Sequence, residues 1–497
     1  MIDTDALQAA FTLLAGSWQP WLVVIPGLLI GLFAGAIPGL QISMAMAVFL
    51  PLTLYMDFLS AMLFLTAIFT GGTFGSGIPA ILMNIPGTSS AIATAFDGYP
   101  MARAGRHNEA LGLSLGASSI GTAVGYGILL CLIAPLSTAV LKLGPSELFV
   151  VVLWGITLIA LLSGKQLWKG LFAGAIGLLA GTVGMSAIGA IRGTMGIPDL
   201  LDGIPTVPAM IGLFAASELF SLSNQPYLVA DEASRRVNFK KLMRGFTSAF
   251  RYPVVVLRGS LIGALVGAVP GVGSSVSNLV SYAETKRHDA DPDSFGKGNP
   301  KGVLASESAN SSSEGGSMVT LLALGIPGGG GTAVMLAAFS MHNITGGPRF
   351  IREQTDIVYA IILANFVQVL LLIIVGLLLL RVLAAVVKVP LRVLVPSVLM
   401  LAVLGAYGLT GTMAGPFTVL GFGALGWWMR RHGYSIPAIV IGLLLGGMTE
   451  GELIRTYQIS GGDIAFLWNR PITLIMMALL FASLGLRPLL NRLQRWI

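Results

Sequence analysis

The chain contains the same interrupted apolar segment twice, and this repetition limits the folds that it can adopt. Residues 30–40 read IGLFAGAIPGL and residues 262–272 read IGALVGAVPGV, so each copy ends an apolar run with the pattern G-x3-G-x2-P-G. A second break follows each copy, in ILMNIPGTSS at 81–90 and in LALGIPGGGG at 322–331. The breaks recur in the same order, with offsets of 232 and 241 residues, which indicates an internal duplication.

The composition places these segments in a membrane. The 497 residues are 55% hydrophobic and only 10% charged, whereas about a quarter of the residues in a soluble protein are charged. Apolar runs such as 356–380 are long enough to cross a hydrocarbon core, which needs ~20 apolar residues. We therefore expect an all-α polytopic membrane protein with about ten to twelve membrane segments, some of them re-entrant hairpins.

The charges of the loops predict an orientation. The connector 222–257 is rich in Lys and Arg, and the positive-inside rule places it in the cytoplasm together with the basic C-terminal tail. The N-terminus and the loops 191–203 and 449–470 carry acidic residues and are expected on the periplasmic side. Residues 97–109 would then face inward and the matching residues 340–355 outward, so the two copies would have inverted topology. Full spans are expected near 110–131, 145–163, 170–190, 204–221, 393–411, 415–429, 434–448 and 471–487, besides the run 356–380.

The duplication divides the chain into four predicted parts. Residues 1–221 form the first inverted repeat, and residues 258–470 form the second. The basic connector 222–257 joins them, and residues 471–497 add a C-terminal helix with a basic tail. The first stretch of the chain has no Lys or Arg, so we expect no cleaved signal peptide.

Each Pro-Gly pair predicts the end of a helix at membrane depth. Proline removes a backbone donor and glycine tolerates positive φ, and open backbone is stable in lipid only where protein or a cavity covers it. A half-helix that begins after a break presents bare N–H groups and its positive dipole end, which favours an anion. For one break the alternative is a packing kink, but matched pairs favour a transporter-like binding site. The breaks are Pro38-Gly39, Pro86-Gly87, Pro270-Gly271 and Pro327-Gly328.

Small polar residues follow the breaks and are the candidate ligands. We expect an anionic substrate at the second and fourth breaks, held by N–H and hydroxyl groups. The candidate substrate-binding residues are Asn84, Pro86, Gly87, Thr88, Ser89, Ser90, Pro327, Gly328, Gly329, Gly330 and Thr332. Carbonyl, hydroxyl and amide oxygens near the other breaks suit Na⁺. The candidate cation-binding residues are Gly39, Gly271, Gly273, Ser274, Ser275, Asn310, Ser311 and Glu314.

Acidic residues also lie close to these segments. Glu307 and Glu314 belong to ESANSSSEGG, and acidic residues at membrane depth are costly and usually functional. Glu314 is therefore a candidate for binding a coupling cation or a proton, and the alternative is that water solvates both carboxylates at the membrane interface. Asp97 is expected to be a helix cap or a loop carboxylate, and the stretch 283–302, absent from the first copy, a surface loop.

No pattern for enzymatic catalysis is present. The four histidines are scattered and none forms HExxH, there is no GxxxxGK[ST] loop, and Cys131 is the single cysteine. We therefore expect no enzyme activity, no cofactor and no direct use of ATP, so that an ion gradient or voltage would supply energy. An intramembrane enzyme that uses Glu307 or Glu314 as an acid or base is the weaker alternative. The net charge of +7 fits basic cytoplasmic loops rather than nucleic-acid binding.

Further short motifs carry a family resemblance. The first half contains GG-x-[YF]-G, ILxNIPG and DGYxMARxG, and the second contains GxxPGxG, Y-x2-E-x-KR, FGxGxxxGV, ExAN and LxLGIPG. Over roughly residues 20–350, the chain resembles the large membrane subunit of the tripartite tricarboxylate transporters, the TctA type. The resemblance implies a multi-pass secondary transporter of the bacterial inner membrane, working with a periplasmic substrate-binding protein and a small membrane subunit of about four helices.

The resemblance also implies the substrate class and the energy source. A carboxylate, with citrate-like compounds as the type case, would be imported by symport with Na⁺ or H⁺, and an elevator-like movement of one bundle would fit inverted repeats. A binding-protein-independent carrier or an anion channel built on the same breaks is the alternative. Gln41, Phe74, Ser311, Glu314 and the glycines 328–331 depart from the family pattern beside the candidate site, so the identity of the carboxylate stays open.

Overall fold

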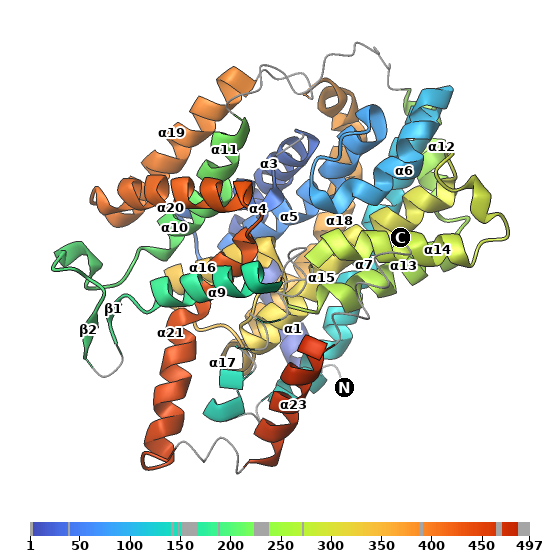
Figure 1. The fold of residues 1–497 in the computed structure, drawn as a ribbon. Helices are drawn as coiled ribbons and strands as arrows, with labels where there is room; N and C mark the ends of the chain where they lie inside the picture. Colours follow the sequence, from blue (N-terminus) through green and yellow to red (C-terminus); the bar gives the residue numbers. More distant parts are fainter. Residues whose placement is uncertain are drawn as a thin grey trace.

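The computed structural model describes an almost entirely helical protein (Figure 1). The described residues are 3–37, 40–140, 144–147, 149–150, 153, 157, 167–186, 189–222, 238–270, 273–386, 391–463 and 470–485. Within these ranges, 5 helices are long and apolar enough to cross a membrane, namely Gln19–Ala36, Phe58–Met83, Ser89–Leu136, Thr355–Leu380 and Ile436–Ile459. Shorter apolar helices accompany them. The chain is therefore a multi-pass α-helical membrane protein, as predicted.

Helices from both halves of the chain pack into one core bundle. From the first half come α1 (Thr4–Gly16), α2 (Gln19–Leu22), α3 (Val24–Ala36), α4 (Ile42–Phe49), η1 (Leu50–Tyr55), α5 (Phe58–Met83), η2 (Ser89–Ala91), α6 (Ile92–Met101), η3 (Ala102–Arg106) and α7 (His107–Val140). From the second half come α12 (Phe239–Ala249), α13 (Pro253–Gly267), α14 (Gly273–Arg287), η6 (Pro292–Ser294), α15 (Pro300–Leu324), α16 (Gly330–Met341), α17 (Pro348–Glu353) and α18 (Thr355–Val386). In this bundle α3 packs along α5 and α13 along α15, while α15 packs on α7 and joins the halves.

The two halves share the local structure of their breaks. α5 and α15 both end on a left-handed residue, Asn84 at φ 60° and Gly325 at φ 69°. A Cβ on Gly87 would meet the carbonyl oxygen of Gly35, and a Cβ on Gly328 would meet that of Gly267, 2.8 Å away. Only glycine permits these close approaches, so equivalent positions of the two copies make equivalent contacts. The inversion of the copies relative to the membrane remains a prediction.

A second bundle lies beside the core and appears on the left of Figure 1. It contains α9 (Leu167–Gly181), η4 (Pro198–Leu200), α10 (Thr206–Ile211), η5 (Gly212–Ala216), α11 (Ser217–Leu222), α19 (Leu391–Thr410), α20 (Ala414–Arg431) and α21 (Ile436–Ile459). The helix α23 (Pro471–Gly485) lies apart from it, at the bottom of Figure 1, and its Thr473 donates to Glu147 at 2.7 Å. α9 packs on α21, and α20 packs on the α10–α11 segment. Strands β1 (Gly184–Met185) and β2 (Ile191–Arg192) form a short antiparallel hairpin between α9 and α10. The second bundle meets the core mainly at α4, η1 and α16.

Some predicted boundaries are wrong. α9 ends at Gly181, so the span expected at 170–190 is too long, because Gly184 at φ 110° turns the chain into the hairpin. α21 continues to Ile459, so the expected loop 449–470 begins inside a helix, and its acidic residues are paired in the structure. Residues 97–109 contain the end of α6 and the start of α7, with a kink between them at Gly105, whose φ is 78°.

The predicted connector is partly helical. Residues 223–237 lie outside the described part, as do most of the span expected at 145–163 and the tail from residue 486. The rest of the connector includes α12 and the start of α13, which begins at Pro253. α12 buries Leu242 and Gly245 against α7, and α13 leaves it at an angle of 74°.

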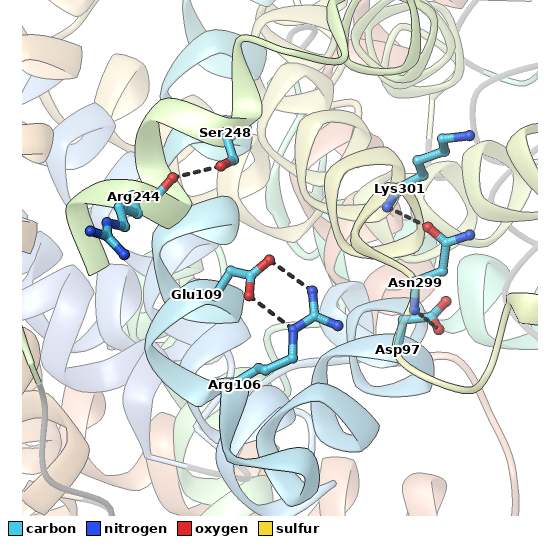
Figure 2. Close-up of polar contacts among 7 residues, drawn as sticks. All are labelled: Asp97, Arg106, Glu109, Arg244, Ser248, Asn299 and Lys301. Carbon is cyan, nitrogen blue, oxygen red and sulfur yellow. Dashed lines mark hydrogen bonds and ion pairs between the residues drawn. The ribbon is translucent and has the colours of Figure 1, made fainter. Parts of the chain in front are cut away.

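Asp97 joins α6 to the loop before α15 (Figure 2). It is fully buried within α6, where its carboxylate accepts the N–H groups of Gly296, Gly298 and Asn299 at 2.8–2.9 Å. The hydroxyl of Tyr282 donates to the same carboxylate at 2.8 Å. The prediction of a helix cap or a loop carboxylate is therefore wrong, because Asp97 lies inside α6, from where its side chain stabilises a neighbouring loop.

The predicted surface loop 283–302 contains the end of α14, an exposed turn and the start of α15. Lys301 donates to Asp289 at 2.6 Å across this turn. Burial tends to raise the pKa of Asp289, but the hydrogen bond from Lys301 and those from backbone amides outweigh it and lower the pKa. The ion pair between Lys301 and Asp289 thus stabilises the turn.

Candidate functional site

A cavity of about 610 Å³ lies where residues that follow the four predicted breaks come together. This volume is within the range of about 300–1,000 Å³ typical of small-molecule sites. From the core bundle the lining residues are Gln41, Ile42, Ser43, Phe69, Thr88, Ser89, Ser90, Ser274, Ser275, Val276, Ser317, Gly329, Gly330 and Gly331. From the second bundle they are Phe214, Arg430, Tyr434, Ser435, Ile436 and Pro437. The cavity therefore lies between the bundles, with residues that follow every break on its wall.

The local sequence explains why helices end and begin beside this wall. α5 and α15 end three residues before Pro86 and Pro327, where a proline cannot continue the helical hydrogen bonds. New helical segments then begin at Ser89 and at Gly330. At the first break α3 ends at Ala36 and α4 begins at Ile42. The helix starts thus face the cavity, as the half-helix interpretation predicts.

Hydroxyl groups connect the second break to the third. The hydroxyls of Ser89 and Ser275 are 2.7 Å apart, and those of Thr88 and Ser90 are also 2.7 Å apart. The side-chain amide of Asn278 donates to the backbone carbonyl of Ser90. These bonds hold two break segments from opposite halves of the chain together on one wall of the cavity.

The positions equivalent to Ser89 and Ser275 in the opposite copies carry only one hydroxyl side chain. Offsets of 241 and 232 residues relate Ser89 and Ser275 to Gly330 and Ser43. A Cβ on Gly330 would lie 3.1 Å from the Cβ of Ser43, so the equivalent positions meet again. Because Gly330 has no hydroxyl, this side leaves the start of α16 open, and the cavity is asymmetric.

The other candidate residues lie behind or away from the lining. Asn84 is exposed, and the N–H of Gly87 donates to the carbonyl of Ser76 at 3.1 Å. Thr332 is buried and accepts the N–H of Gly329 at 3.0 Å, so it satisfies the first amide of that helix. Gly273 begins α14. Pro86 is half-buried, and Pro327 and Gly328 are buried. Gly39 and Gly271, with Pro38, are outside the described residues.

Glu314 is buried in the core bundle. It is 0% exposed, its carboxylate accepts the hydroxyl of Thr70 at 2.9 Å, and it accepts that of Tyr126 at 2.8 Å. Glu307 is also 0% exposed. The alternative in which water solvates both carboxylates is therefore wrong, because hydroxyl-bearing helices cover α15 on these sides.

Asn310 and Ser311 lie between these two carboxylates on α15. The amide of Asn310 donates to the carbonyl of Thr73 at 3.3 Å. The side-chain oxygens of Asn310 and Ser311 are buried, and neither has a hydrogen-bond partner in the described part of the chain. Buried oxygens of this kind are potential ligands for a cation.

Sequence reasoning missed the part of the wall that comes from the second bundle. Arg430 is the one charged residue among the lining residues that the structure describes, and its Nε donates to the hydroxyl of Ser217 at 3.1 Å. Tyr434 and Ser435 follow it at the start of α21. The signal in the sequence is the basic pair Arg430-Arg431 followed by Ser435-Ile436-Pro437, but a basic pair at the end of an apolar run by itself indicates only orientation.

The fold and the cavity together define a class of protein. Broken helices from two similar halves surround a polar cavity inside a multi-pass membrane bundle, which is the arrangement of secondary transporters. The family model of the tripartite tricarboxylate transporter TctA family matches residues 21–441. The chain therefore belongs to the TctA family, and it is a large membrane subunit of a transporter rather than an enzyme.

Two relatives from Agrobacterium vitis extend this comparison. An uncharacterized 52.8 kDa protein in the TAR-I ttuC' 3' region is 32% identical over 456 residues, which cover 91% of this chain and 90% of the relative. An uncharacterized protein in the TAR-II ttuC' 3' region is 32% identical over 232 residues, or 46% of this chain and 94% of the relative. No solved structure matches the chain.

Proposed function

We propose that this chain is the permease subunit that imports a carboxylate across the bacterial inner membrane. A periplasmic binding protein delivers the carboxylate, a small membrane subunit completes the complex, and a Na⁺ or H⁺ gradient drives uptake by symport. The N-terminus is periplasmic and the C-terminus cytoplasmic in this proposal. The observation that carries it is the cavity of about 610 Å³, on whose wall residues following all four breaks converge.

The wall of the cavity suits a carboxylate. Backbone N–H groups at the helix starts after the second and fourth breaks offer partial positive charge, and the hydroxyls of Thr88, Ser89 and Ser90 can donate to carboxylate oxygens. Arg430 adds a full positive charge at the same wall. A tricarboxylate or dicarboxylate would thus meet donors from both bundles.

In this proposal the coupling cation binds beside the carboxylate site. Ser274 and Ser275 line the cavity, and the buried oxygens of Asn310 and Ser311 lie on α15 near Glu314. Oxygen ligands of this kind suit Na⁺, and a carboxylate at membrane depth suits either Na⁺ or a proton. The cation would neutralise part of the substrate charge before the loaded site crosses the bilayer.

The position of the cavity suits an elevator-like step. The core bundle carries the breaks, and it meets the second bundle mainly at α4, η1 and α16. A rigid core that moves past the second bundle would carry the carboxylate with it, because most lining residues belong to the core. The second bundle, including Arg430, would then form the stationary wall.

Uptake into proteoliposomes tests this function. Labelled mono-, di- and tricarboxylates are offered to vesicles that contain the chain and its small subunit, with the binding protein and an inward Na⁺ or H⁺ gradient each present or absent. Saturable uptake that requires both the binding protein and a gradient is expected. Uptake that ignores the binding protein would favour a stand-alone carrier, and non-saturating, voltage-dependent conductance would favour an anion channel. No uptake under any condition would overturn the proposal.

A further inference from the structure

A separate cluster of buried oxygens surrounds Glu307, away from the cavity. Its carboxylate accepts the hydroxyl of Thr94 from α6 at 2.5 Å and the hydroxyl of Ser118 from α7 at 3.0 Å. All three residues are buried with 0% exposure. None of them lines the cavity in which the carboxylate is proposed to bind. The cluster therefore needs an explanation of its own.

A third hydroxyl faces the same carboxylate. Ser114 of α7 is 0% exposed, and its hydroxyl contacts the carboxylate of Glu307 with poor hydrogen-bond geometry. A Cβ placed on Gly77 of α5 would lie 2.8 Å from Oε1 of Glu307 and 3.1 Å from Oγ of Ser114. Both oxygens therefore pack against the backbone of Gly77, and a side chain there would take the space that they occupy. Oxygens from α6, α7 and α15 converge beside a glycine of α5.

The charge of this cluster is not balanced by the protein. Within the described ranges, no Lys, Arg or His forms an ion pair with Glu307. A buried, ionised carboxylate is strongly unfavourable unless a cation accompanies it. A proton on the carboxyl group would also balance this charge, and measuring bound Na⁺ distinguishes the two. A small cation that prefers oxygen ligands accounts for the carboxylate and the hydroxyls together.

We propose that Glu307, Thr94, Ser114 and Ser118 form a Na⁺ site. The site is distinct from the candidate cation residues around Glu314, because its hydroxyls come from α6 and the first half of α7. Its role in coupling rests on the proposed function, but binding of Na⁺ itself does not.

The position of Thr94 gives the site a route to the substrate. α6 begins at Ile92, directly after the segment Ser89–Ala91 that lines the cavity. Thr94 also contacts Ser306 through hydroxyls 2.9 Å apart, so α6 is fixed to α15 beside the site. Na⁺ bound at Glu307 would hold α6, and therefore its carboxylate-binding end, in place. By linkage, the carboxylate would in turn strengthen Na⁺ binding.

Equilibrium binding of radiolabelled Na⁺ to the purified full chain tests the site without transport. The variants are E307Q, S114A and G77A, of which the last fills the space without changing charge. S119A is the control for the serine, because the hydroxyl of Ser119 bonds to the carbonyl of Leu115 at 2.8 Å. G127A is the control for the glycine, because no atom lies within 4 Å of its Cβ position. Size-exclusion profiles verify that each variant folds.

The expected result is loss of one bound Na⁺, or affinity weakened by roughly tenfold or more, in E307Q and S114A, with S119A and G127A unchanged. If G77A folds, it should behave like E307Q. Na⁺ binding that is the same in E307Q and S114A as in the unmodified chain would overturn the site, as would absence of any bound Na⁺. If the chain takes up carboxylate but E307Q binds Na⁺ as the unmodified chain does, the Na⁺ site would be overturned and the proposed function would stand. A variant-sensitive Na⁺ site in a chain that takes up no carboxylate would overturn only the proposed function.

Discussion

Ser89 and Ser90 are the side chains on which the proposed carboxylate site depends most. Both line the cavity, one bonded to Ser275 and the other to Thr88. The variant S89A/S90A removes two donors, and a hydrogen bond to a charged group contributes about 1.5–3 kcal/mol. We expect KM for uptake to rise roughly ten- to a hundredfold, with normal expression. S248A, on the surface of α12, is the matched control. Equal KM values in both variants would count against this placement.

A substitution at Gly330 tests whether the missing side chain makes the cavity asymmetric. In the variant G330S the new Cβ would lie 3.1 Å from Ser43, and the added hydroxyl would occupy the start of α16. We expect uptake to fall sharply while the protein still folds, because the open N–H groups of this half become covered. G127S adds the same side chain at a position with no neighbour within 4 Å. Uptake by G330S at the rate of G127S would show that this half binds no substrate.

Single residues also mark the limit of sequence reasoning. The burial of Glu307 and Glu314 could not be predicted, because it depends on hydroxyl donors such as Thr70 and Tyr126, which lie far away in the chain. Arg430 was missed for the same reason: its place at the cavity follows from the packing of α20 on the α10–α11 segment. Local patterns identify a polar residue in an apolar run, but not what covers it.

The helix ends, in contrast, could be predicted from local chemistry. Proline and glycine remove a donor and release the backbone, so α5 and α15 end before Pro86 and Pro327 as expected. The end of α9 and the length of α21 could not be predicted. At α9 an apolar run continues into a hairpin, and along α21 ion pairs such as that of Glu450 with Arg192 keep acidic residues on a helix.

The contact between α6 and the loop before α15 is an element whose stability can be measured. The carboxylate of Asp97 accepts bonds from three backbone N–H groups and from Tyr282. The variant D97N loses the charge and one acceptor, so we expect the free energy of unfolding to fall by about 2 kcal/mol or more. Thermal unfolding in detergent would detect this as a lower Tm. D293N, at an exposed position of the same loop, is the control. Identical Tm values would mean that Asp97 does not hold the loop.

At the scale of the whole molecule, two bundles share one cavity. The core supplies the breaks, and the second bundle supplies Arg430 and the start of α21. The class of the fold followed from hydropathy and the repeated breaks, because both reflect the bilayer as solvent. The relative placement of the two bundles could not be predicted in this way, since it depends on contacts among α4, η1, α16 and distant helices. This junction is where a carboxylate would be enclosed or released.

The most direct test of the account is substrate protection of the cavity wall. In a background in which Cys131 is replaced by Ser, single cysteines are placed at Ser43 and Ser274, which line the cavity, and at the exposed Phe239 of α12. The rate of modification by a small thiol reagent is then measured with and without the carboxylate identified by uptake. We predict that the carboxylate slows modification at Ser43→Cys and Ser274→Cys and leaves Phe239→Cys unaffected. Equal rates at all three positions with saturating carboxylate would contradict a binding site at the junction of the breaks.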